Sequence, residues 1–249
     1  MNAVVEITRS AFDAVVMDLD GVITDTASLH EKAWKRMFDG FLSARPAHAG
    51  EDHRPFENDD YRRFVDGMPR FDGAMGFLTS RGIDVPPDEV SELAASKDGD
   101  FQDLLAQEGA QLIPGSLQLL VALRRAGFRT AIVTASRNCD AVLSSAGLTD
   151  FFDASVDGVI AAELGLPGKP DPAVYLEAAG RLRTPPGRSV VVEDALAGVE
   201  AGRRGGFGLV VGVDRADHGQ ELLDHGANAI VRDLTGVEVA SVAMEGPRP

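Results

Sequence analysis

Two carboxylates lie close together near the start of the chain. Asp18 and Asp20 follow the apolar run at residues 14–17 and precede Gly21. A short apolar run followed by a turn signal is typical of a buried strand in a parallel sheet, and ligands bind at the carboxyl ends of such strands. Side chains two apart on an extended strand share a face, so these carboxylates need a compensating cation or proton. The pair therefore predicts a site for a divalent cation such as Mg²⁺, which prefers oxygen ligands.

Three further segments of the chain contain side chains that suit phosphate chemistry. Thr134 follows one apolar run, Lys169 stands before a proline, and Glu193 and Asp194 close another apolar run. Each position taken alone also fits a helix cap, a solvated lysine or favourable acids at a helix start. Together they supply a nucleophile, a hydroxyl, a rigidly presented ammonium and a second acidic pair, which is the equipment of phosphoryl transfer.

Alternating strand and helix patterns must position these groups. Apolar runs typical of buried strands occur at residues 14–17, 130–133, 189–192, 209–213 and 229–231. Helical patterns lie between them, at residues 116–126, 172–182 and 195–204. This alternation predicts an α/β fold with a Rossmann-like parallel sheet covered by helices.

One long stretch interrupts the alternation. Between residues 27 and 109 no strand pattern is present, and helical patterns follow one another with a polar loop at residues 44–60. The helices are expected at residues 28–42, 59–65, 73–79 and 88–108. We therefore predict a small α-helical cap domain at residues 28–109, inserted after the first strand into a catalytic core of residues 1–27 and 110–249.

Composition and charge limit the possible partners. Of the 249 residues 44% are hydrophobic, and 24 basic against 39 acidic side chains leave a net charge of −15. Nucleic acids and anionic membranes bind clusters of Lys and Arg, so neither is expected as a partner of this acidic chain. The single Cys139 permits no intramolecular disulfide, and no apolar run approaches the length of a membrane span. We expect a cytoplasmic protein, and a monomer.

These four segments, in this order, resemble the motifs of the haloacid dehalogenase superfamily of phosphotransferases, and the resemblance extends over nearly the whole chain. Motif one is the segment from Asp18 to Thr26, and the later motifs are Thr134, Lys169 and Glu193–Asp194. The resemblance implies that Asp18 becomes phosphorylated, that Asp20 is the general acid and base, and that Thr134 and Lys169 bind the phosphoryl oxygens. It also implies Mg²⁺ as cofactor, held by Asp18, Asp194 and the backbone carbonyl of Asp20, with Glu193 supporting directly or through water.

Within that superfamily the chain resembles the β-phosphoglucomutase-like subfamily most closely. The similar segments include His30 and Trp34, the loop at residues 65–70, and residues 135–138. Arg70 would hold the distal phosphate of a sugar bisphosphate, and Thr26 and His30 would couple cap closure to the acid Asp20. The implied substrate-binding residues are His30, Trp34, Gly67, Arg70, Ala135, Ser136, Arg137 and Asn138. One position departs from the pattern, because Asp66 stands where the mutases carry a lysine.

The resemblance implies conversion of β-glucose 1-phosphate into glucose 6-phosphate, with a sugar-phosphate phosphatase of the same fold as the alternative. A carbon–halogen hydrolase is disfavoured, because it has no leaving oxygen for Asp20 to protonate. A carbon–phosphorus hydrolase would need a cap lysine, for which Lys32 and Lys35 are the candidates. A non-catalytic module of the same fold is a further alternative, since fold alone does not imply function.

Overall fold

The computed structural model describes residues 4–46, 48–215 and 217–240. Its core is a six-stranded, all-parallel sheet in the order β4-β3-β2-β5-β6-β7, as the alternating pattern predicts. The strands are β2 (Ala14–Asp18), β3 (Arg129–Val133), β4 (Ala154–Val156), β5 (Ser189–Glu193), β6 (Leu209–Val213) and β7 (Ala229–Val231). The five strands expected from the apolar runs are all present, and the α/β fold class is confirmed.

The strand order reverses direction at β2. From β2 the chain first runs outward through β3 and β4, and it then returns to the other side of β2 with β5, β6 and β7. Every residue of β2 and β5 is buried, which explains their near-continuous apolar sequences. The register pairs Asp18 with Val133 and Met17 with Val192, so the ends of three strands meet at one edge. Ligands of open parallel sheets bind at such a reversal point.

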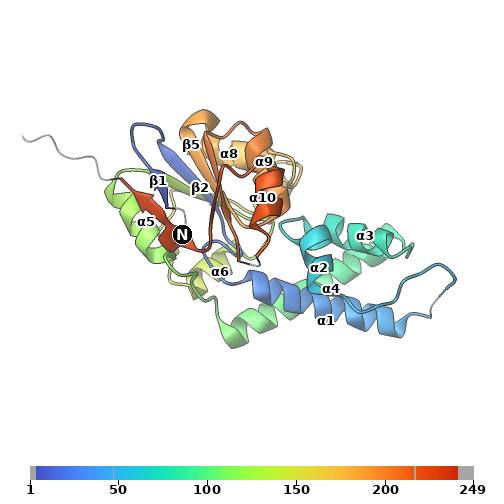
Figure 1. Ribbon diagram of the computed structural model, residues 1–249. Helices are drawn as coiled ribbons and strands as arrows, with labels where there is room; N and C mark the ends of the chain where they lie inside the picture. Colours follow the sequence, from blue (N-terminus) through green and yellow to red (C-terminus); the bar gives the residue numbers. More distant parts are fainter. Residues whose placement is uncertain (1–3, 47, 216, 241–249) are drawn as a thin grey trace, which may run out of the picture.

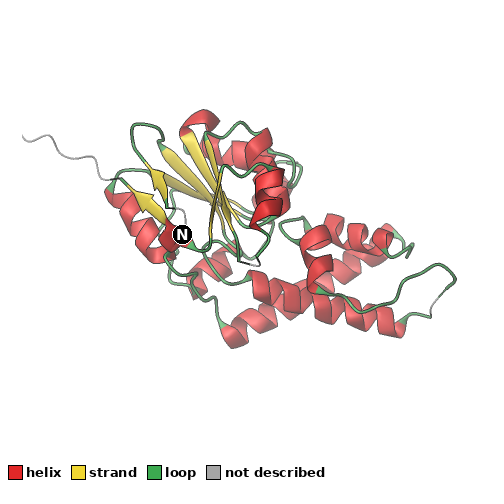
Figure 2. Cartoon of the chain, in the orientation of Figure 1, coloured by secondary structure: helices red, strands yellow, loops and turns green. Residues whose placement is uncertain are grey.

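Helices cover both faces of this sheet (Figure 2). On one face lie α5 (Ser116–Arg125) and α6 (Cys139–Ser145), whose apolar side chains join Met17 and Val192 in one core cluster. On the other face α8 (Ala173–Arg181), α9 (Leu196–Arg204) and α10 (Gly219–His225) pack against Val16 and Val191. The remaining short helices are α7 (Gly158–Glu163), η2 (Pro186–Arg188) and η3 (Leu234–Gly236).

The sequence patterns missed several short elements. Besides β4, α7 and α10, they missed β1 (Val5–Ile7) and β8 (Val237–Val239), which pair with each other as a separate parallel ribbon. The strands among these have only three residues each, and β1 and β8 both place a glutamate in the centre. Each of these strands has a polar residue at its centre, Glu6, Ser155 or Glu238, so no apolar run marks it.

The helical insert has a core of its own (Figure 1). It comprises α1 (Ala27–Ala44), α2 (Asn58–Asp60), the π-helix η1 (Tyr61–Val65), α3 (Arg70–Ser80) and α4 (Pro87–Glu108). Phe38, Phe56 and Phe77 pack against one another at its centre, with ring centroids 4.2–5.1 Å apart. Long α1 packs along α4, and residues 48–57 form the irregular polar loop expected from the sequence. The proposed domain boundaries at residues 28 and 109 fall close to the start of α1 and the end of α4.

None of the helices in the described ranges combines the length and the apolar character that a membrane crossing requires.

Candidate active site

Asp18 is the last residue of β2 and is fixed by two hydrogen bonds. The residue is 5% exposed. One carboxylate oxygen accepts the backbone N–H of Asp20 at 2.8 Å, and the other accepts Lys169 Nζ at 2.5 Å. Burial raises the pKa of Asp18 well above its usual value; the charge of Lys169 offsets this in part, and the negative charges of Glu193 and Asp20 add to it. The site therefore holds more negative charge than its own cations balance.

Lys169 lies behind this carboxylate rather than in open space. It is 2% exposed, and its ammonium also donates to Glu193 Oε1 at 2.5 Å. The same Glu193 oxygen accepts Tyr175 OH at 2.9 Å, while the other accepts the N–H of Ala195 at 2.7 Å. Because both oxygens of Glu193 already accept protein donors, this arrangement makes Glu193 the residue that orients Lys169. The expected support of a metal by Glu193, directly or through water, stays a prediction.

Asp194 presents an oxygen that no donor satisfies. Its Oδ1 is buried without a hydrogen-bond partner, and its Oδ2 lies 3.8 Å from Arg215 Nη1. Burial, and then the charges of Asp66, Glu193 and Asp18, raise the pKa of Asp194 well above its usual value. A side chain at Gly21 would come within 1.8 Å of Asp194 Oδ2, so only glycine leaves room for this carboxylate. An unpaired buried carboxylate oxygen in an acidic cluster fits a metal ligand.

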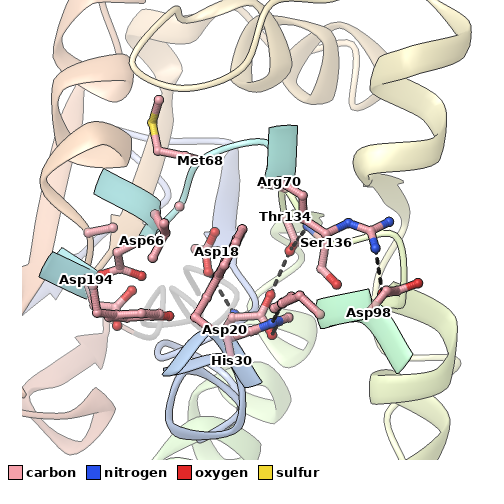
Figure 3. Close-up of a pocket in the computed structure, with 17 residues that line it drawn as sticks. Asp18, Asp20, His30, Asp66, Met68, Arg70, Asp98, Thr134, Ser136 and Asp194 are labelled. Atoms are coloured by element: carbon pink, nitrogen blue, oxygen red, sulfur yellow. Dashed lines mark hydrogen bonds and ion pairs between the residues drawn. The ribbon is translucent and has the colours of Figure 1, made fainter. Parts of the chain in front are cut away.

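The metal-binding side chains do not form a ready-made cage. Throughout residues 4–46, 48–215 and 217–240, no three His, Cys, Asp or Glu side chains converge as a metal site. The expected ligands do not require three such side chains, because they are the side chains of Asp18 and Asp194 and the backbone carbonyl of Asp20. Asp66 faces the same space as these two acids (Figure 3). The residues present therefore fit a divalent cation, which would neutralise their mutual repulsion.

Asp20 is anchored away from Asp18 by three neighbours. Thr26 Oγ1 donates to Asp20 Oδ1 at 2.6 Å, Thr134 Oγ1 donates to Oδ2 at 2.7 Å, and His30 Nε2 lies 3.3 Å from Oδ1. Burial raises the pKa of Asp20, but the His30 ring and the two hydroxyls outweigh burial and hold the pKa below its usual range. Asp20 is therefore a carboxylate in this arrangement, and the hydroxyl of Thr134 binds it instead of facing open space.

A buried lysine that the sequence analysis did not single out extends this network. Lys97 Nζ lies 2.6 Å from His30 Nδ1, and its ammonium stands over the Trp34 and Phe101 rings at 5.2 and 5.1 Å. Burial, helped by the charge of Arg70, lowers the pKa of Lys97 to about 7. Its position offered a signal, because it lies on the apolar stripe of α4 that also contains Val90, Ala94, Phe101 and Leu104. The result is a continuous path Lys97–His30–Asp20 from the insert to the core.

The predicted substrate residues divide between two neighbouring cavities. A chamber of about 40 Å³ is lined by Asp18, Asp20, His30, Trp34, Gly67, Arg70, Thr134, Ala135, Ser136 and Asp194. A larger cavity of about 620 Å³ is lined by Arg137 and Lys169 and shares Arg70, Thr134 and Ala135 with the chamber. Asn138 lines neither, and its side-chain amide donates to Asp98 on α4 at 2.8 Å. The chamber is narrow, because the insert lies over the carboxylates and contributes His30, Trp34, Gly67 and Arg70 to its walls.

Asp66 is the position at which the sequence departs from the pattern that it otherwise resembles. It follows η1, and its carboxyl faces the chamber beside Asp194 (Figure 3). Burial and the nearby charge of Glu193 raise its pKa to about 7. An acid rather than a lysine in this place adds negative charge to a cluster that already carries an excess.

Fold and site together define a capped α/β enzyme whose reactive carboxylates lie at the reversal point of a parallel sheet. The chain belongs to the haloacid dehalogenase-like hydrolase family, whose model matches residues 12–206. It is 44% identical over 234 residues to a β-phosphoglucomutase of Mycobacterium bovis, with 89% of each chain covered. The crystal structure of a Clostridium difficile β-phosphoglucomutase matches with a TM-score of 0.73 and 25% identity, covering 90% of this chain and 92% of that one.

A further relative is much longer than this chain. The chain is 41% identical over 242 residues to a Mycobacterium tuberculosis protein described as an uncharacterized glycosyl hydrolase. The match covers 94% of this chain but only 18% of that protein. The same kind of unit is therefore found inside a larger polypeptide.

Proposed function

We propose that this chain is a magnesium-dependent β-phosphoglucomutase, which converts β-glucose 1-phosphate into glucose 6-phosphate through a phosphorylated Asp18. The observation that carries the proposal is the pocket between insert and core that both Asp18, held by Lys169, and the separately anchored Asp20 line. The similarity to β-phosphoglucomutases over most of the chain supports the choice of substrate.

Asp18 is placed to act as the nucleophile. Its carboxylate is held by the N–H of Asp20 and by Lys169, so its orientation costs nothing at the moment of attack. An Asp18 oxygen would bond to phosphorus as the bond from phosphorus to the sugar oxygen breaks. Lys169 and Thr134 would then share the negative charge of the transferring phosphoryl group. Thr134 becomes available for this task when Asp20 releases its hydroxyl.

Asp20 is placed to move the proton. As a carboxylate it has the form that accepts a proton from a sugar hydroxyl attacking the aspartyl phosphate. The proton then resides on Asp20. When Asp18 attacks the phosphate at the other end of the sugar bisphosphate, the bond from that phosphorus to the sugar oxygen breaks, and Asp20 gives its proton to this oxygen. Movement of the insert would change the distance between His30 and Asp20, because His30 belongs to α1 and contacts Lys97 of α4. This path connects closure of the insert with the protonation of Asp20.

Asp18, Asp194 and the backbone carbonyl of Asp20 would hold Mg²⁺, consistent with the unsatisfied oxygen of Asp194. When bound, the ion supplies positive charge that offsets the acidic cluster and the phosphoryl oxygens. Closure of the insert over the sugar phosphate would exclude bulk water, which would otherwise hydrolyse the aspartyl phosphate.

A sugar-phosphate phosphatase is the second candidate, and Asp66 is the observation that favours it. An acid in place of the mutase lysine removes a cation from the substrate space and repels a second phosphate. Water would then be the acceptor of the phosphoryl group, with Asp18 and Asp20 in unchanged roles.

One assay separates the two activities. The protein is incubated with β-glucose 1-phosphate, Mg²⁺ and a trace of glucose 1,6-bisphosphate, and glucose 6-phosphate and free phosphate are measured together. Formation of glucose 6-phosphate without matching phosphate release supports the mutase. Phosphate release alone identifies a phosphatase, and the absence of both products rejects glucose phosphates as substrates.

We further propose that the chain acts in the cytoplasm as a monomer with a sugar phosphate as its partner. The net charge of −15 and the single cysteine support this proposal, and they speak against binding to nucleic acid or anionic membrane. The proposed domains are a core of residues 1–27 and 110–249 and a cap of residues 28–109.

A further inference from the structure

Asp98 joins the helical insert to the core through a single oxygen. Its Oδ1 lies 2.9 Å from Arg70 Nη1 and accepts the side-chain amide of Asn138 at 2.8 Å. Arg70 begins α3 in the insert, whereas Asn138 precedes α6 in the core. Gln102, one turn further along α4, donates weakly to both Asp98 and Asn138. One carboxylate thus connects two parts of the chain that must separate when the insert opens.

The two groups that donate to Oδ1 of the Asp98 carboxylate, Arg70 and Asn138, are of the kind that bind anions in proteins. A guanidinium and a primary amide that converge on one oxygen suit an anionic oxygen of any origin, including one of a phosphate. Under the proposed function, Arg70 holds the phosphate at the far end of a sugar bisphosphate. In this structure the carboxylate of Asp98 fills that place (Figure 3).

The same pair stands between the two cavities. Arg70 and Asp98 line both the 40 Å³ chamber and the 620 Å³ cavity beside it. The chamber alone is too small for a hexose phosphate, so a ligand reaching from Asp18 to Arg70 must part Arg70 from Asp98. The Arg70 and Asp98 side chains are 18% and 24% exposed, so water competes for the pair and its separation costs little.

We infer that Asp98 is a specificity-determining residue, an internal anion that occupies the subsite of the distal phosphate and must be displaced by it. A phosphate monoester carries up to two negative charges and three acceptor oxygens, against one charge for Asp98, so it wins the competition. A substrate with a neutral far end gains no contact with Arg70 that offsets the separation of the pair, so it binds less tightly. This inference rests on the proposed function, because it takes Arg70 as the ligand of the distal phosphate.

The test measures binding without turnover. In a background of Asp18→Asn, which removes the nucleophile, the affinity for glucose 1,6-bisphosphate is determined by calorimetry with Mg²⁺ present. Adding Asp98→Asn is expected to tighten binding about fivefold, since it removes a partly exposed ion pair that competes with the ligand. Adding Asp103→Asn, the same change of charge at an exposed position of α4, controls for long-range charge and is expected to leave affinity within twofold.

A third variant separates failure of the inference from failure of the proposed function. Arg70→Ala in the same background is expected to weaken binding at least tenfold. If it does not, the distal-phosphate role of Arg70 in the proposed function is wrong. If it does, but Asp98→Asn binds no more tightly than Asp103→Asn, the inference about Asp98 alone is overturned. Asp98→Ser provides the same comparison if Asp98→Asn does not fold, as judged by its thermal melting.

Discussion

Asp66 offers a direct measure of the excess negative charge in the site. Its carboxyl faces Asp194 and lies in the chamber with Asp18, and burial raises its pKa from the usual 3.8 to about 7. A pKa raised in the folded state means that the folded protein binds the proton more tightly than the unfolded chain does. The cost to stability is therefore absent below pH 3.8, grows as the pH rises and is complete above pH 7.

The size of this cost follows from the shift. Raising a carboxyl pKa from 3.8 to about 7 corresponds to about 4 kcal/mol. The Asp66 side chain is partly exposed, which roughly halves the value because water screens the charge. Replacing Asp66 with asparagine keeps the shape and removes the charge. The variant should gain about 2 kcal/mol of unfolding free energy over the wild type at pH 8.5.

Urea denaturation in EDTA at pH 5 and pH 8.5 tests this expectation. The gain of the variant should be clearly smaller at pH 5, and Mg²⁺ should reduce it at pH 8.5, because the ion would neutralise the same cluster. Asp103→Asn on the exposed face of α4 should change stability by less than about 0.5 kcal/mol at both pH values. A variant that is destabilised, or stabilised equally at both pH values, would refute the reasoning.

Three further substitutions probe the roles proposed for the site. Asp20→Ala should lower kcat by roughly 100- to 10,000-fold, as expected for loss of the general acid and base, and a near-normal rate would contradict that role. Lys97→Met should lower kcat at least about tenfold with little change in KM, since the substitution breaks the 2.6 Å contact with His30. Its free energy of unfolding, relative to that of the wild type, should be higher below pH 7, because the wild-type protein then buries a charged ammonium. Arg70→Ala should reduce mutase turnover far more than hydrolysis of p-nitrophenyl phosphate, and equal losses would exclude a distal-phosphate role.

The sequence by itself determined the sheet and the edge at which the chemistry lies. Buried parallel strands need apolar side chains on both faces, so β2 and β5 stand out as runs of valine and similar residues. Parallel strands end at a common edge, and this rule alone placed Asp18, Thr134 and Asp194 near one another. The short strands β1, β4 and β8 gave no such signal, because a polar residue at the centre of each one interrupts the apolar run.

Only the tertiary structure decided which groups the insert brings to that edge. Lys97 and His30 are 67 residues apart, and Asp98 and Asn138 are 40 apart, so no local periodicity connects either pair. Their contacts depend on how α4 packs along α1 and how the insert closes on the core. Likewise, the sequence showed that Glu193 is an acid at a strand end but not that it orients Lys169. That role depends on the tertiary contacts of Glu193 with Lys169 and Tyr175. Such contacts are set by packing between distant elements, because the energy of a buried polar group depends on the partners that surround it.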